Sequence, residues 1–157
     1  MHAGAVRRVS ALTRHLCTAV SVDPFCAPGP SGLLRVYGAR TSRVCKVLWA
    51  ADECGVPTEH AALPVSALRQ ADWYLKLNSK GTVPTARDGP LVLNESNTIM
   101  VYLTHKYGEP AGLGLYPESP ELLAQAWQWI EYAETTLVPA TNPLFFGVMR
   151  GTGYPDK

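Results

Sequence analysis

Along the middle of this chain, the pattern of apolar and polar residues changes several times between one typical of strands and one typical of helices. Residues 33–37 and 58–63 are rich in apolar and β-branched side chains, which predicts two short β-strands. Residues 42–54 instead carry apolar side chains at helical spacing and are followed by Gly55, a common helix stop. A strand, a helix and a second strand predict a βαβ unit with parallel strands and a right-handed crossover.

The next stretch predicts a helix and then a hairpin. Residues 67–77 have helical spacing of their apolar positions. Pro84 excludes the helical conformation at Val83, so the chain is expected to be extended there. Asp88-Gly89 between apolar residues is a strong hairpin signal, and a returning strand should follow it.

Ser96 then predicts the start of another helix, because serine is a favoured N-cap and apolar residues follow at helical spacing. The element order over residues 33–108 is therefore βαβαββα, an α/β fold. Residues 109–118 are rich in glycine and proline, which is typical of a linker between domains.

Residues 119–157 predict the start of a separate, all-helical domain. Ser119 is a favoured cap and Pro120 suits the first helical position. The helix should run to about Leu137 with a broad apolar face that needs partner helices. Beyond Pro139, prolines and glycines interrupt the pattern.

The first 32 residues have a different composition from the rest. They are basic and rich in hydroxyl side chains, and their first acidic residue is Asp23. This composition is typical of an organelle transit peptide, which would direct the protein to a mitochondrion or plastid. A disordered leader or an over-extended gene start accounts for the composition equally well. We expect a cytoplasmic protein, with a mitochondrion or plastid as the alternative location if residues 1–32 are a transit peptide.

Composition excludes several classes of protein. With 157 residues, 46% apolar content and a net charge of +1, the chain fits an ordinary globular protein and has no field to attract nucleic acid. No apolar run approaches the roughly 18 residues that a membrane span needs. The cysteines show no Cys-x-x-Cys spacing and no histidine at ligand spacing, so we expect no metal site and a reducing compartment. They are Cys17, Cys26, Cys45 and Cys54.

A family resemblance lies in residues 78–108. Lys-Gly-Thr-Val-Pro, Asp-Gly, Leu-x-Leu-x-Glu-Ser and a helix ending Tyr-Leu-x-x-Lys-Tyr-Gly follow in that order. This string resembles the glutathione-binding half of the cytosolic glutathione S-transferases. The resemblance implies a thioredoxin-like domain, glutathione as co-substrate, and transfer of its thiolate to a small electrophile in detoxification.

The resemblance also implies roles for five residues. Val83 would align the backbone of glutathione, and Pro84 would be cis. Glu95 would hold the amine of the γ-glutamyl group, and Ser96 its carboxylate. Lys80 is a looser candidate for the glycyl carboxylate.

Four residues compete to activate the thiol. Ser42, expected as the N-cap of the first helix, matches serine-type transferases, and Thr41 is its neighbour. Tyr37 corresponds to the donor of tyrosine-type members, but its place inside a strand favours a core role. Cys45 would instead form a mixed disulfide with glutathione, although we expect it to be buried and inert.

The resemblance covers only the opening helix of the second domain. We therefore expect the sequence to be a fragment, the alternative being a truncated product whose exposed apolar face favours association. The full-length protein would be a homodimer. An alternative to an enzyme is a non-catalytic interaction domain of the same fold, as in the gamma subunit of translation elongation factor 1.

Overall fold

The computed structural model describes residues 33–149 and 151 of the chain. It consists of two compact units, Met1–Leu115 and Tyr116–Lys157, which are described separately. The boundary falls within the stretch 109–118 that the sequence suggests as a linker. The leader or transit peptide lies outside the described residues, so both it and the location of the protein stay predictions.

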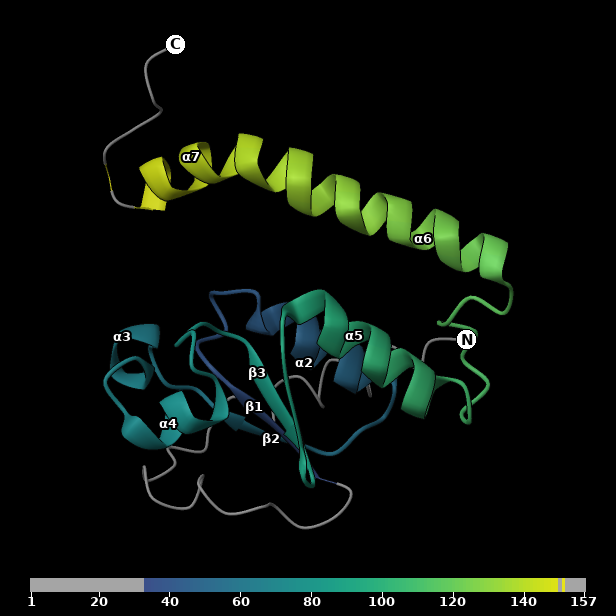
Figure 1. Cartoon of the computed structure of the whole chain (residues 1–157), viewed down its shortest axis with the longest axis horizontal. Coiled ribbons are helices and arrows are strands. Elements are labelled where there is room, and N and C mark those ends of the chain that lie inside the picture. The colour runs from purple at the N-terminus through teal and green to yellow at the C-terminus, as the bar shows by residue number, and fades with distance from the viewer. Residues whose placement is uncertain (1–32, 150, 152–157) are drawn as a thin grey trace, which may run out of the picture. The chain divides into compact units, whose positions relative to one another are not determined.

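The first unit is built around a mixed four-stranded sheet (Figure 1). The strands lie in the order β2-β1-β3-β4, in which β1 pairs parallel with β2 and antiparallel with β3, and β3 pairs antiparallel with β4. This arrangement confirms the βαβ unit, the hairpin and the thioredoxin-like fold. The strands are β1 (Leu34–Tyr37), β2 (Thr58–Ala61), β3 (Thr85–Asp88) and β4 (Leu91–Asn94).

Helices cover both faces of the sheet (Figure 1). On one face, Leu34 and Val36 of β1 pack against α2 and α5 in the larger core cluster. On the other face, Tyr37 packs with side chains of α3 and α4. Successive side chains of β1 point to opposite faces of the sheet, so they contribute to two separate core clusters. The helices are α2 (Val44–Glu53), α3 (Val65–Leu68), α4 (Asp72–Leu77) and α5 (Ser96–Leu103), which continues into the π-helical turn η1 (Thr104–Gly108).

One predicted helix is in fact two. Instead of a single helix over 67–77, the chain forms α3 and α4, separated at Ala71, whose backbone is extended (φ −96°, ψ 109°). The break lets each short helix bury one large side chain, Leu68 in α3 and Tyr74 in α4. The residue spacing alone did not reveal this change of direction.

The second unit, Tyr116–Lys157, contains consecutive helical segments. Ser119 caps the first, as predicted, because its Oγ accepts a hydrogen bond from the Leu122 N–H at 3.2 Å. The expected interruption after Pro139 is wrong, since helix continues through this proline and Pro143 to Met149. A π-helical turn lies directly before this helical segment. The segments are α6 (Pro120–Tyr132), η2 (Ala133–Leu137) and α7 (Val138–Met149).

Candidate functional site

Three segments leave the sheet of the first unit at the same end. Tyr37, the last residue of β1, pairs with Thr85, the first residue of β3. Thr85 also pairs with Asn94, the last residue of β4. The strand register therefore brings together the loop after β1, the segment before β3 and the start of α5, which hold most of the residues proposed from the sequence.

Gly38 lets the first two of these segments pack closely. Its φ is 120°, and a Cβ there would lie 2.8 Å from Val44 Cγ2 and 2.8 Å from Val83 Cβ. No side chain fits in this space, so glycine is required both by conformation and by contact. The loop that carries Ser42 is thereby set directly against Val83.

Ser42 lies in the turn that leads into α2. It is not the N-cap as expected, because α2 begins at Val44 and Arg43 holds the cap position. The Ser42 hydroxyl donates to the Ala39 carbonyl at 2.6 Å and accepts from the Val44 N–H at 3.3 Å. Its single proton can be redirected to a ligand by rotation about the Cβ–Oγ bond. Thr41 beside it is exposed.

Tyr37 is a core residue, as its predicted place inside a strand favoured. Its side chain is fully buried, and its ring lies 5.9 Å from the rings of both Trp73 and Tyr74. Burial raises the pKa of its hydroxyl. A ligand thiolate has no access to this hydroxyl without disruption of the core.

The two cysteines of the described residues have opposite environments. Cys45 is exposed, so the expectation that it is buried is wrong. It is the second residue of α2, where the helix turns Val44 and Val47 toward the core and Cys45 away from it. Cys54 is the buried one, and burial raises the pKa of its thiol.

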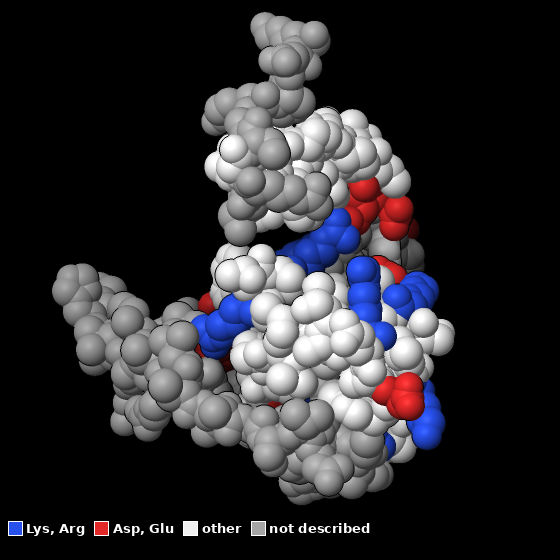
Figure 2. All heavy atoms as spheres, turned by 90° about the vertical axis from the view of Figure 1, so that its left-hand side faces the viewer, with Lys and Arg blue, Asp and Glu red and all other residues white. Residues whose placement is uncertain are grey.

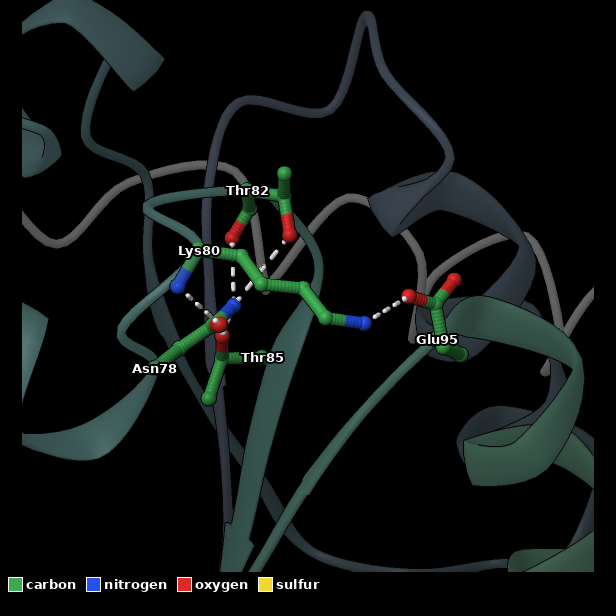
Figure 3. A network of polar contacts seen from close by, with 5 residues as sticks. All are labelled: Asn78, Lys80, Thr82, Thr85 and Glu95. Carbon is green, nitrogen blue, oxygen red and sulfur yellow. Dashed lines mark hydrogen bonds and ion pairs between the residues drawn. The ribbon is translucent and has the colours of Figure 1, made fainter.

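The Val83-Pro84 peptide bond is cis, and a buried polar network holds the segment before it (Figure 3). Asn78 Nδ2 donates to the Thr82 carbonyl at 2.9 Å and to Thr85 Oγ1 at 3.0 Å. Asn78 is only 2% exposed, so these bonds are shielded from water. Sequence patterns assign no role to Asn78, because an Asn before Ser-Lys-Gly is typical of an ordinary turn.

Glu95 and Ser96 form the start of α5. Ser96 is the first helical residue and not the N-cap expected from the sequence, since Glu95 holds that position. Glu95 has φ 72° and ψ 115°, the only positive φ at a non-glycine residue in the described chain. Such a conformation costs about 1–3 kcal/mol and is concentrated at functional sites. Ser96 is buried, whereas Glu95 is exposed.

Lys80 and Glu95 contact each other in this structure. Lys80 Nζ lies 3.0 Å from Glu95 Oε1, and each side chain is 60% exposed (Figure 3). The sequence placed these two residues at opposite ends of one ligand. Their contact puts the Lys80 ammonium at the Glu95 end of the site.

The surface charges form no continuous basic stripe in the view of Figure 2, where Lys and Arg side chains lie in separate places among uncharged residues. Within residues 33–149 and 151, no group of three or more His, Cys, Asp or Glu side chains is arranged to hold a metal ion. No helix in this same part of the chain combines the length and apolar character needed to cross a membrane.

Comparison with known proteins identifies relatives of this chain. The N-terminal domain profile of the glutathione S-transferases matches residues 36–111. Glutathione S-transferase GstB of Escherichia coli (strain K12) is 33% identical over 123 residues, which are 75% of this chain and 57% of GstB. Glutathione S-transferase 1 of Triticum aestivum is 32% identical, over 72% of this chain and 51% of its own length.

A solved structure gives the same result. The theta class glutathione S-transferase of Xanthomonas axonopodis pv. citri, with glutathione bound, is 36% identical and superimposes with a TM-score of 0.68. The match covers 79% of this chain and 57% of that one. The chain thus spans little more than half the length of the relatives it matches.

Proposed function

Because this chain belongs to the glutathione S-transferase family, we propose that its first unit binds glutathione and prepares the thiol for attack on a small electrophile. The observation that carries the proposal is the meeting of three segments at one end of the sheet. They supply the Ser42 hydroxyl, the backbone beside cis-Pro84, and the pair Glu95-Ser96.

Ser42 is the proposed thiol-activating residue. A free thiol has a pKa near 8.5 and is mostly protonated at neutral pH. A hydroxyl that donates to the thiolate contributes about 1.5–3 kcal/mol, which lowers the thiol pKa by roughly one to two units. Ser42 would give up its bond to the Ala39 carbonyl and make this stronger, charge-assisted bond instead.

The other two segments would hold the rest of glutathione. The backbone of Val83, beside cis-Pro84, would offer peptide groups to the cysteinyl part of the ligand. Ser96 offers its N–H and hydroxyl to the γ-glutamyl carboxylate, at a helix start where the dipole favours an anion. The exposed carboxylate of Glu95 would accept the ligand ammonium.

Calorimetric titration of glutathione into the 157-residue chain tests this proposal. Glu95→Gln keeps the shape of the side chain but removes its charge, so affinity should fall about 10- to 150-fold, the equivalent of one charged hydrogen bond. Glu109→Gln, a change at another exposed glutamate, should have no effect. Equal affinity of wild type and Glu95→Gln would contradict the assignment, and a folded chain that does not bind would favour the non-catalytic interaction domain.

Ser42→Ala tests the activation step separately from binding. The thiol pKa of bound glutathione, followed by thiolate absorbance, should rise by about one to two units. Transfer to an electrophile should slow accordingly, while glutathione affinity at low pH is retained. Ser66→Ala, at an exposed serine of α3, is the matched control.

The exposure of Cys45 favours a second candidate, thiol transfer. Its thiolate would attack a glutathione mixed disulfide, form a bond to the glutathionyl sulfur and release the other thiol as the leaving group. A second glutathione thiolate would then regenerate Cys45 and leave as glutathione disulfide. Cys45→Ala should abolish this reaction and spare transfer to electrophiles, whereas Ser42→Ala should do the opposite.

We also propose that the full-length protein is a homodimer and that it acts on small electrophiles in detoxification. Sedimentation analysis of a chain as long as the relatives would check the assembly.

A further inference from the structure

The ion pair between Lys80 and Glu95 has the same chemistry as the contact proposed for the ligand. We propose that Lys80 is an internal competitor for Glu95: its ammonium occupies the place that the γ-glutamyl ammonium of glutathione takes when it binds. Glutathione binding then exchanges one ammonium for another at a single carboxylate. This inference rests on the proposed function and defines which end of the ligand Lys80 faces.

The geometry places Lys80 at the γ-glutamyl end of the site. Its Nζ lies 3.0 Å from Glu95 Oε1, and in Figure 3 its side chain extends from the segment before cis-Pro84 toward Glu95. Three residues in extended conformation span about 10 Å, so the glycyl carboxylate of a bound tripeptide lies well away from its amine. A lysine in contact with Glu95 faces the amine.

The backbone of Lys80 is tied to the polar network under the site. Its N–H donates to Asn78 Oδ1 at 3.2 Å, and the Asn78 amide group is itself bonded to Thr82 and Thr85. The start of the Lys80 side chain is therefore fixed, while its ammonium is exposed and free to turn away. A ligand ammonium that approached Glu95 would meet repulsion from Lys80, which favours exchange over sharing.

The expected effect is small, because both partners of the pair are 60% exposed. Exposed ion pairs contribute about 1.4- to 5-fold to an equilibrium constant. Lys80 thus tunes the affinity of the site without closing it. It also favours ligands that bring an ammonium of their own, because only these replace the contact that Glu95 loses.

The test is calorimetric titration of the full chain with glutathione, in wild type, Lys80→Met and the control Lys76→Met. Lys80→Met should tighten binding about 1.4- to 5-fold, because Glu95 no longer has to release a partner. This gain should shrink as the salt concentration rises. Wild type must break the Lys80–Glu95 ion pair to bind glutathione and the variant need not, and salt weakens that ion pair by screening. Lys76 is exposed in α4, and its replacement should change nothing.

A second ligand tests the role of the glutathione ammonium group by itself. With N-acetyl glutathione, which lacks the charge, Lys80→Met should bind no more tightly than wild type. Weaker binding of both ligands to Lys80→Met would show that Lys80 holds a ligand carboxylate and would overturn the proposal, as would an unchanged affinity for glutathione. In either case, loss of binding in Glu95→Gln would leave the proposed function intact. No glutathione binding to any variant would overturn both.

Discussion

The two units of this chain differ in how they bury their side chains. Among the described residues, the apolar core side chains all lie between Leu34 and Leu103, in the first unit. In the second unit, neither α6 nor η2 contains a buried residue, and large apolar side chains such as Trp129 and Phe145 are about half exposed or more. The first unit is organised by a buried core, whereas the described side chains of the second unit include no buried apolar residue.

The difference shows what each kind of sequence pattern can specify. Local hydrogen bonds and caps give a helix its boundaries, but most helical stability in proteins comes from packing of an apolar face. The second unit has the boundary signals, such as the Ser119 cap, but neither α6 nor η2 contains a buried residue. We therefore expect substitutions to be costly in the first unit and nearly silent for stability in the second.

The largest effect is expected from a matched pair of leucine substitutions. Leu103→Ala removes a fully buried side chain of α5 and should lower the free energy of unfolding by about 2–5 kcal/mol. Leu122→Ala, at a position of α6 that is 53% exposed, should change it by less than about 0.5 kcal/mol. Urea unfolding followed by circular dichroism measures both. Similar losses in the two variants would mean that the second unit also has a buried core.

Asp88→Asn should give the next largest effect. Asp88 Oδ2 accepts hydrogen bonds from Tyr102 at 2.6 Å, Lys106 at 2.8 Å and Tyr107 at 2.6 Å, which fasten the hairpin to the helical end at η1. Since bonds to a charged group contribute about 1.5–3 kcal/mol, the variant should lose about that much stability. Asp52→Asn, at a half-buried aspartate of α2, is the control.

The same carboxylate predicts a pH dependence. Burial alone would raise the pKa of Asp88, but hydrogen bonds from Lys106, Tyr102 and Tyr107 outweigh it and leave the pKa below its ordinary value. Its stabilisation is therefore complete above the unfolded pKa of about 3.9 and is lost as pH falls through the lower folded pKa. The stability of wild type should fall toward that of Asp88→Asn below about pH 4. A constant difference between the two down to pH 2 would contradict this assignment.

This network illustrates what the sequence could and could not predict. Asp88-Gly89 predicted the hairpin correctly, because the turn depends on local conformation. The convergence of Asp88 with Lys106 depends on how the hairpin lies against α5, which spacing along the chain does not contain. The order of strands and helices along the first unit was largely predictable, apart from the division of the helix expected over 67–77 into α3 and α4, but long-range polar contacts were not.

The candidate site shows the same division. The string from Lys80 to Ser96 indicated two of the three segments that meet at one end of the sheet, since its order along the chain is itself a signature. Its finer details were missed: the exposure of Cys45, the role of Asn78 and the Lys80 contact with Glu95 all depend on side-chain directions.

Asn78→Ala should have an intermediate effect. It removes the buried amide that bonds to Thr82 and Thr85, so we expect a loss of about 1–2 kcal/mol in unfolding free energy. Asn142→Ala, in α7 of the second unit, is the matched control and should lose little. Chemical unfolding measures both, and glutathione titration of the folded variant would show whether this network also orders the site. Equal stability of wild type and Asn78→Ala would contradict a structural role for the network.

Ser119→Ala should have the smallest effect on the stability of the whole chain. It is also the most direct test of the difference between the two units. Loss of the Ser119 cap leaves the Leu122 N–H without its side-chain acceptor and costs about 1 kcal/mol of helix stability. Because no residue of α6 is buried, packing cannot compensate, and the loss should appear as fraying of the first turn in NMR chemical shifts of Leu122 and Leu123.

The urea midpoint of the first unit should stay unchanged in this variant, since its core contains no residue of α6. Ser66→Ala provides the reference, because Ser66 is an exposed residue inside α3 and caps nothing. If Ser119→Ala moved the midpoint of the first unit, the two units would unfold as one cooperative body. An unchanged midpoint with a frayed α6 would mean that the proposed glutathione site keeps its stability independently of the helix that follows it.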